Sequence, residues 1–257
     1  MLKQHQYALS IAGFDPSGGA GLVADIKTFE QLNVYGLGVC TANTVQTEEQ
    51  LSSVKWVLSH TIFLQLEILL KKYPLTYIKI GLIESFSIVI EVIDFLKKSF
   101  PFIKIIWDPI LSSSSGFHFH SEFSYDEFIE ICKKVFLITP NSEEIKKLMN
   151  EGNDLKAAGR LKNFTNVFVK SVAGADNQLF DLLFTEGNEY YFETHFLNGY
   201  KKHGSGCVLS SAITAFLTRG NNLLISCKLA REYTRKFLLS SDGLLGIHKN
   251  IKIEVHE

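Results

Sequence analysis

The sequence predicts a single α/β domain in which helices cover both faces of a mostly parallel sheet. Short apolar runs alternate with segments of helical periodicity along most of the 257 residues, as in repeated strand–helix–strand units. Polar residues follow several apolar runs directly, which is expected where parallel strands end at a ligand site. No Pro-, Gly- or Ser-rich linker divides the chain, so one domain over residues 1–257 is predicted.

Apolar runs indicate the strands of the first half of the chain, and helical spacing of apolar residues indicates its helices. Leu22, Ile26 and Phe29 lie in phase on one face of the first helix. Pro74 ends the second helix, because proline cannot continue a helical hydrogen-bond ladder. The predicted strands are Tyr7–Gly13, Tyr35–Thr41, Tyr77–Gly81 and Ile103–Trp107, with a short strand as the interpretation of Ser53–Leu58, and the helices are Leu22–Leu32, Thr61–Lys72 and Ser85–Lys98.

The second half repeats the alternation and adds a hairpin. Two alternating runs flank Glu186-Gly187-Asn188, which is typical of a β-hairpin turn. The predicted strands are Val135–Thr139, Asn166–Ser171 and the hairpin pair Gln178–Phe184 and Glu189–Glu193, and the helices are Tyr125–Lys133, Ser142–Met149, Asn153–Asn163, Cys207–Thr218 and Asn222–Leu239.

Composition excludes several classes of partner. Basic residues number 26 and acidic residues 27, for a net charge of −1, so no electrostatic footprint for nucleic acid or an anionic membrane is present. No apolar run approaches the roughly 18–20 residues that span a bilayer, and the N-terminal residues lack a signal-peptide pattern. The four cysteines lie far apart without a C-x-x-C pair. A cytoplasmic protein with reduced thiols is expected.

Two glycine-rich loops are candidates for ligand contact. His203-Gly204-Ser205-Gly206-Cys207 runs directly into a predicted helix, where backbone N–H groups and the helix dipole suit an anion such as phosphate. Three glycines also lie in Phe14–Gly21 after the first strand. Neither loop matches the P-loop pattern. The alternative for each loop is an ordinary turn beside a buried helix.

Polar residues at the ends of strands are the remaining candidates. In an open α/β sheet, ligands bind outside the carboxyl ends of the strands. Each residue has a structural alternative as a cap, a turn residue or a solvated strand end, but together they favour a Mg²⁺–phosphate site, since magnesium prefers oxygen ligands. These residues are Asp15, Gln46, Asp108, Asn141, Glu144 and Lys170.

Several ordered stretches resemble the hydroxymethylpyrimidine/phosphomethylpyrimidine kinases, a family of the ribokinase-like superfamily. The resemblance runs from about Ala8 to the last helix. Its motifs are Ile11–Gly21, Ala24–Thr28, Thr41–Gln46, Lys79–Gly81, Asp108-Pro109, Thr139–Asn141 with Glu144, and His203–Cys207.

The resemblance implies a three-layer α/β/α sandwich and an enzyme that uses ATP and Mg²⁺. Its reaction would be phosphorylation of 4-amino-5-hydroxymethyl-2-methylpyrimidine and then of the monophosphate, in thiamine biosynthesis. Relatives of this kind are often homodimers, so a homodimer is expected. Small-molecule substrates are implied as the partners, with no nucleic acid and no membrane.

The resemblance also implies roles for individual residues. Gly204, Ser205 and Gly206 would form the anion hole for the transferred phosphoryl group, with Cys207 beside the substrate hydroxymethyl group. Because a helix N-terminus favours a thiolate, Cys207 is predicted to accept the proton; the alternative is a small buried residue that only shapes the pocket. The substrate-binding residues would be Gly13, Gly19, Asp25, Gln46 and Leu82; the nucleotide- or phosphate-binding residues would be Asp108, Asn141, Glu144 and Lys170, with Asp108 and Glu144 near the metal through water.

The nucleotide half departs more from the family pattern than the substrate half does. Lys170-Ser171-Val172-Ala173-Gly174 stands where the family usually has Lys-Gly-Gly-His, so phosphate contacts from this loop are less expected. Four serines, Ser112–Ser115, replace a stretch that tends to carry lysine. Lys201 and Lys202, just before the anion loop, could compensate for the missing lysine, but a solvated charge pair is the favoured interpretation.

Two further functions compete with the first. A pyridoxal or pyridoxine kinase of the same superfamily acts on a ring of similar size, although typical pyridoxal kinases have aspartate at the position of Cys207. A non-catalytic pyrimidine-binding protein would result if the altered loops had abolished phosphoryl transfer.

Overall fold

The computed structural model describes residues 6–113, 115–120, 123–174, 178–194 and 201–249. Its sheet has nine strands in the order β3-β2-β1-β4-β5-β6-β7-β8-β9. The strands are β1 (Tyr7–Phe14), β2 (Tyr35–Gln46), β3 (Leu51–Trp56), β4 (Leu75–Ile80), β5 (Lys104–Trp107), β6 (Leu137–Ile138), β7 (Asn166–Ala173), β8 (Leu179–Phe184) and β9 (Glu189–Thr194).

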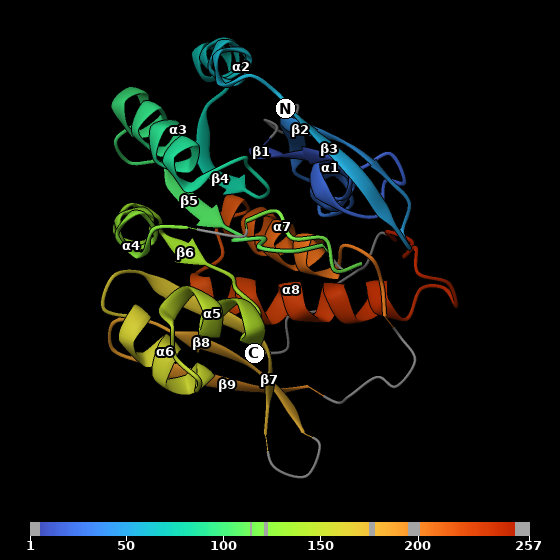
Figure 1. Ribbon diagram of the computed structural model, residues 1–257, viewed down its shortest axis with the longest axis vertical. Helices are drawn as coiled ribbons and strands as arrows, with labels where there is room; N and C mark the ends of the chain where they lie inside the picture. The colour runs from blue at the N-terminus through green and yellow to red at the C-terminus, as the bar shows by residue number, and fades with distance from the viewer. Residues whose placement is uncertain (1–5, 114, 121–122, 175–177, 195–200, 250–257) are drawn as a thin grey trace, which may run out of the picture.

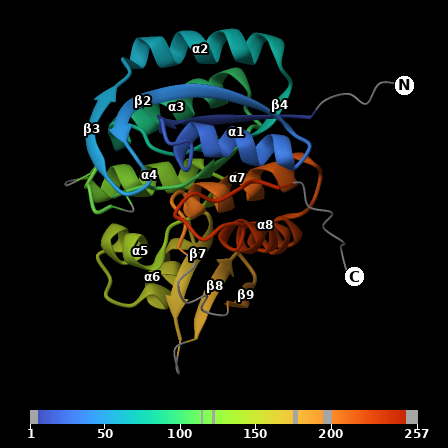
Figure 2. The same cartoon turned by 90° about the vertical axis from the view of Figure 1, so that its right-hand side faces the viewer.

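The central strands are parallel, and antiparallel strands are added at both edges. Every neighbouring pair from β2 through β7 is parallel. β3 pairs antiparallel with β2, and β8 and β9 extend the other edge as antiparallel strands. Figure 2 shows these last strands at the bottom of the molecule, beside α5 (Ser142–Met149) and α6 (Asp154–Leu161). The mostly parallel sheet and the predicted hairpin are confirmed.

Helices cover both faces of the sheet, which confirms the three-layer arrangement. Figure 1 shows α3 and α4 on one side of the central strands and α7 on the other. The first layer is α2 (Ser59–Lys72), α3 (Phe86–Ser99), α4 (Tyr125–Lys134), α5 (Ser142–Met149) and α6 (Asp154–Leu161), and the second is α1 (Gly21–Gln31), α7 (Ser205–Thr218) and α8 (Leu223–Leu238).

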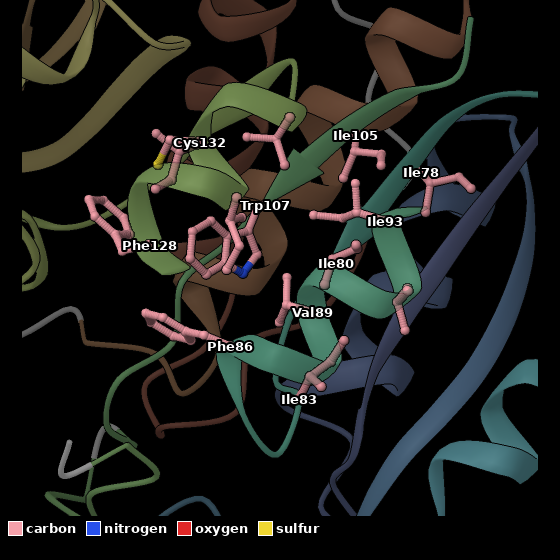
Figure 3. Close-up of a cluster of buried hydrophobic side chains, with 14 of the residues drawn as sticks. Ile78, Ile80, Ile83, Phe86, Val89, Ile93, Ile105, Trp107, Phe128 and Cys132 are labelled. Atoms are coloured by element: carbon pink, nitrogen blue, oxygen red, sulfur yellow. The ribbon is translucent and has the colours of Figure 1, made fainter. Parts of the chain in front are cut away.

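The alternation of side chains along the strands divides the core between these two layers. Ile105 and Trp107 of β5 point into the cluster under α3 and α4, whereas Ile106 points toward α7. Trp107 meets the ring of Phe86 edge-on, with centroids 5.4 Å apart, and Figure 3 shows both rings beside Phe128. Strands buried on both faces read as continuous apolar runs, which is why the sequence identified them.

β2 and β6 differ most in length from the sequence-based prediction. β2 continues to Gln46 instead of ending at Thr41, because its last residues pair with β3 in an antiparallel ribbon. β6 is shorter than predicted and covers Leu137–Ile138. Among the described residues, no helix is both long and apolar enough to cross a membrane. One domain over 1–257 stays a prediction.

Candidate active site

A cavity of about 270 Å³ opens at the carboxyl ends of the parallel strands. The chain leaves β1 to form β2 on one side and later adds β4 on the other, and such a reversal of strand order leaves a crevice for ligands. The strand-end residues lining the cavity are Gly13 and Asp15 after β1, Thr44 and Gln46 of β2, Leu82 after β4, Asp108 after β5, Asn141 and Glu144 after β6, and Lys170 of β7.

The loop Gly204–Gly206 forms one wall of the cavity at the start of α7. The helix begins at Ser205, two residues earlier than predicted, with Gly204 as the N-cap in a left-handed conformation (φ +74°). A Cβ on Gly204 would lie 2.1 Å from the carbonyl oxygen of Gly19. This close approach packs the two glycine-rich loops against each other at the start of α7, whose first turn lines the cavity.

Asp15 and His203 connect the same two loops. The Nε2 atom of His203 lies 2.9 Å from a carboxylate oxygen of Asp15. Asp15 also accepts hydrogen bonds from the backbone N–H of Ser17 and of Ala20, each at 2.8 Å. Burial acts to raise the pKa of Asp15, but the hydrogen bonds from His203, Ser17 and Ala20 outweigh it and hold the pKa at about 2. The Asp15 carboxylate is therefore ionised and holds the two loops together through the hydrogen bonds that it accepts.

Asp108 and Lys170 form a buried ion pair in the cavity wall. The Lys170 Nζ atom lies 2.9 Å from Asp108, which also accepts hydrogen bonds from Thr139 and Ser210. Burial acts against both charges, yet the lysines Lys170 and Lys79 lower the pKa of Asp108, and Asp108 and Glu144 raise the pKa of Lys170. Both groups are ionised at neutral pH, and Lys170 is not a solvated strand end.

Asn141 and Glu144 form a capping box at the start of α5. The Asn141 side chain accepts the Glu144 N–H at 2.8 Å, and the Glu144 carboxylate accepts the Asn141 N–H at 2.8 Å. Burial raises the pKa of Glu144 to about 7, against the attraction of the Lys170 ammonium. The carboxyl group therefore takes either protonation state near neutral pH, and a cation at the cavity would favour the ionised form.

Cys207 lies above a second buried ion pair, and its predicted thiolate character is wrong. Burial raises the pKa of the thiol to about 11, although the Lys79 ammonium acts to lower it. Lys79 and Asp25 are fully buried and 2.8 Å apart, and Asp25 also accepts hydrogen bonds from Ser10 and Ser211. Burial, together with the nearby carboxylates of Asp25 and Asp108, therefore favours the protonated thiol at neutral pH.

The structure brings most of the sequence-predicted site residues to one cavity. Gly13, Gln46, Leu82, Asp108, Asn141, Glu144, Lys170 and residues 204–207 all line it. Gly19 and Asp25 do not: Gly19 packs against His203, and Asp25 is held below the cavity by Lys79. Direct substrate contact by Asp25 is therefore not supported, because its side chain is fully buried.

A second groove continues from the cavity toward α8. It measures about 540 Å³ and shares Asn141, Lys170, Ser205 and Gly206 with the cavity. Ser112 and Ser113 also line the cavity, while Ser114 lies outside the described residues. A phosphate chain lying along the groove would end at the anion loop.

Sequence reasoning did not foresee the burial and the partners of two lysines. Lys79 stands in an apolar strand, and a charged residue in such a run could have signalled a buried partner. Lys202 was interpreted as solvated, but it is 6% exposed and donates hydrogen bonds to the carbonyls of Ser241 and Gly243. The sequence carries no signal for that contact, because the partners lie about forty residues away in the chain.

Ser171 is expected to be a strained position that glycine would relieve. Its φ is +59°, a left-handed conformation that costs a residue with a Cβ about 1–2 kcal/mol. Ser171→Gly should remove this strain from the folded state, but glycine also gives the unfolded chain more conformational freedom, which offsets part of the stabilisation. The midpoint of thermal unfolding should therefore rise by about 1–3 °C. Ser53→Gly, in the exposed part of β3, is the matched control and should lower the midpoint. A lower midpoint for Ser171→Gly would contradict the strain.

The chain is similar in sequence to known kinases. The profile of the family described as phosphomethylpyrimidine kinase matches residues 15–251. The chain is 33% identical over 253 residues to the hydroxymethylpyrimidine/phosphomethylpyrimidine kinase of Aquifex aeolicus, covering 92% of this chain and 96% of that one. It is 30% identical to the Escherichia coli enzyme of the same name, with 92% of each chain covered.

Solved structures give the same fold. The phosphomethylpyrimidine kinase of Clostridium difficile superposes with a TM-score of 0.76 at 28% identity, covering 90% of this chain and 98% of that one. The pyridoxal kinase of Staphylococcus aureus in complex with pyridoxal gives a TM-score of 0.81 at 24% identity, covering 96% and 94%, and this likeness concerns the fold alone. By its sequence match and its fold, the chain belongs to the phosphomethylpyrimidine kinase family.

Proposed function

We propose that the chain transfers the γ-phosphoryl group of ATP to 4-amino-5-hydroxymethyl-2-methylpyrimidine and then to its monophosphate, giving the diphosphate for thiamine biosynthesis. The observation that carries the proposal is the continuity of the cavity and the groove through Asn141, Lys170, Ser205 and Gly206. Two adjoining compartments with an anion loop between them suit a donor and an acceptor that meet at a phosphoryl group.

The cavity is the acceptor compartment in this proposal. Leu82 would pack against the pyrimidine ring, and Gln46 would hydrogen-bond its ring nitrogen and amino group. A side-chain amide both donates and accepts, which matches the aminopyrimidine edge. Gly13 leaves room near the ring, since a Cβ there would come within 3.2 Å of Leu82.

The groove is the nucleotide compartment. Phosphoryl transfer depends mainly on positioning and on stabilising the charge of the transferred group. The backbone amides of Gly204–Gly206 and the ammonium of Lys170 would hold that charge. Lys170 is fixed for this role by Asp108, so it keeps its position without relying on substrate contact.

The residues present suit a magnesium ion held mostly by ATP phosphates and water. The described residues contain no cluster of three His, Cys, Asp or Glu side chains that could hold a metal, and Asp108 is already occupied by Lys170, Thr139 and Ser210. Glu144, and Asn141 beside it, would hold the ion through water, as magnesium sites in kinases commonly do. Bound there, the ion neutralises phosphate charge.

Cys207 is proposed to accept the proton of the attacking hydroxyl. With a pKa of about 11, little of the Cys207 thiol is ionised at neutral pH. At pH values below this pKa, the thiolate fraction increases tenfold for each unit by which the pH is raised. If the thiolate is the base, kcat/KM of the wild-type protein should rise between about pH 7 and about pH 9. Cys207→Ala should lower kcat by about 10²–10⁴-fold, abolish that rise and leave pyrimidine affinity nearly unchanged.

The matched control is Cys132→Ala, which removes a buried thiol from α4 remote from the cavity. It should keep the activity and the pH profile of the wild-type protein. A loss of less than tenfold in Cys207→Ala, with an unchanged pH profile, would contradict the base and leave Cys207 as a residue that shapes the pocket.

Assaying ATP-dependent phosphorylation of the aminopyrimidine and of pyridoxal side by side tests the proposal. Preference for the aminopyrimidine is expected, because Gln46 and Leu82 suit that ring. Preference for pyridoxal would support the alternative vitamin kinase, and binding of the pyrimidine without turnover would support a non-catalytic protein. A homodimer in the cytoplasm remains the expected state, and sedimentation equilibrium would test the dimer.

A further inference from the structure

Among the described residues that line the cavity, Lys202 is the one basic side chain without a carboxylate within ion-pair distance. Asp15 meets His203, and Asp108 meets Lys170. Glu144 is bonded by the backbone N–H of Asn141. Lys202 also lines the cavity, but its hydrogen bonds go to two backbone carbonyls, and no described carboxylate lies within ion-pair distance of it. A buried cation is normally paired with an anion.

The ammonium of Lys202 is nevertheless fixed in place. The side chain is 6% exposed, and it donates to the carbonyl of Ser241 at 2.6 Å and to the carbonyl of Gly243. The neighbouring His203 N–H donates to the carbonyl of Leu244 at 2.9 Å. Three N–H bonds are available to an ammonium group, and the two carbonyls use two of them. These two bonds leave one N–H of the ammonium unused and do not neutralise its charge.

The position of Lys202 assigns it to the acceptor side of the site. It lines the cavity together with Gln46 and Leu82, but it does not line the groove toward α8. Lys170, in contrast, lines both compartments. A cation confined to the acceptor compartment is not needed by a neutral pyrimidine alcohol. It is suited to an acceptor that carries its own negative charge.

We infer that Lys202 binds the phosphate group of a phosphate-monoester acceptor and so serves the second of the two phosphorylations. This inference rests on the proposed function. The ammonium would donate its remaining N–H to a phosphate oxygen and offset the repulsion between the acceptor phosphate and the transferred phosphoryl group. No bond of the reaction is made or broken at Lys202, so it is a specificity residue.

The test compares the alcohol and the monophosphate as acceptors in Lys202→Gln and Lys202→Met. Glutamine keeps a donor group for the carbonyls but removes the charge. For both variants, kcat/KM for the monophosphate should fall about 10–100-fold more than kcat/KM for the alcohol, mainly through KM, because a charge-assisted hydrogen bond is lost. Lys201→Met, which alters the exposed neighbour, should leave the ratio of the two acceptors unchanged.

Equal losses with both acceptors would overturn the inference and leave Lys202 as a clamp for residues 241–243. No loss with either acceptor would overturn it as well, as would a wild-type protein that phosphorylates the alcohol but not the monophosphate. Failure of the proposed function has a different signature, since the wild-type protein would then phosphorylate neither acceptor. If Lys202→Met does not fold, the Lys202→Gln comparison carries the test, with thermal unfolding as the check on its fold.

Discussion

Gly204→Ala is expected to abolish measurable phosphoryl transfer. The new Cβ would lie 2.1 Å from the Gly19 carbonyl oxygen and 2.6 Å from the Ala20 Cα, and both are backbone atoms that no side-chain rotation can move. The two glycine-rich loops would have to separate, which displaces the amides that hold the transferred charge. Loss of one such donor typically costs about 10²–10³ in kcat. Initial rates of ADP formation with the aminopyrimidine measure the loss.

Gly220→Ala is the matched control for Gly204→Ala. Gly220 also has a positive φ, +91°, but no atom lies within 4 Å of the position of its Cβ. The Gly220→Ala variant should be destabilised by the backbone strain of alanine at positive φ, but it should keep wild-type activity. Gly206→Ala probes the same loop more gently, because its Cβ would meet the Lys170 Nζ at 3.3 Å. Folded Gly204→Ala protein with more than a tenth of wild-type activity would refute the anion-loop assignment.

The sequence could predict the cavity because parallel strands place their carboxyl ends at one edge of a sheet. Asp15, Asp108 and Asn141 each follow an apolar run, so recognising the strands was enough to bring these residues together. The capping box of Asn141 and Glu144 is likewise local, since its partners lie three residues apart. Structural features that depend on residues close together in the chain could therefore be predicted from the sequence.

The pairing of buried charges could not be predicted in the same way. Asp25 and Lys79 are separated by 54 residues and meet only because α1 packs beside β1, next to β4 in the sheet. That contact removes Asp25 from the cavity, to which the sequence had assigned it. The predicted thiolate of Cys207 failed for a related reason: the helix terminus is visible in the sequence, but the depth of burial that raises the thiol pKa is a tertiary property.

Lys79→Met is expected to destabilise the protein more than any other single change considered. Removing one partner of a buried ion pair leaves an uncompensated charge and costs about 3–5 kcal/mol. Asp25 would keep its hydrogen bonds from Ser10 and Ser211, but hydroxyl groups do not neutralise a carboxylate. The thermal midpoint should fall by about 10 °C. Loss of the nearby ammonium should also raise the pKa of Cys207 further, which slower alkylation of this thiol would reveal.

The double variant Asp25→Asn/Lys79→Met tests the origin of that cost. Asparagine can still accept a hydrogen bond from Ser10 or Ser211, and neither position then carries a charge. The double variant should be more stable than the sum of the two single changes predicts, by about 2 kcal/mol or more. Lys71→Met is the control, because the Lys71–Glu67 pair is exposed on α2 and exposed pairs contribute little. Additive losses in the double variant would mean that packing of the Lys79 side chain, rather than its pairing with Asp25, stabilises this part of the core.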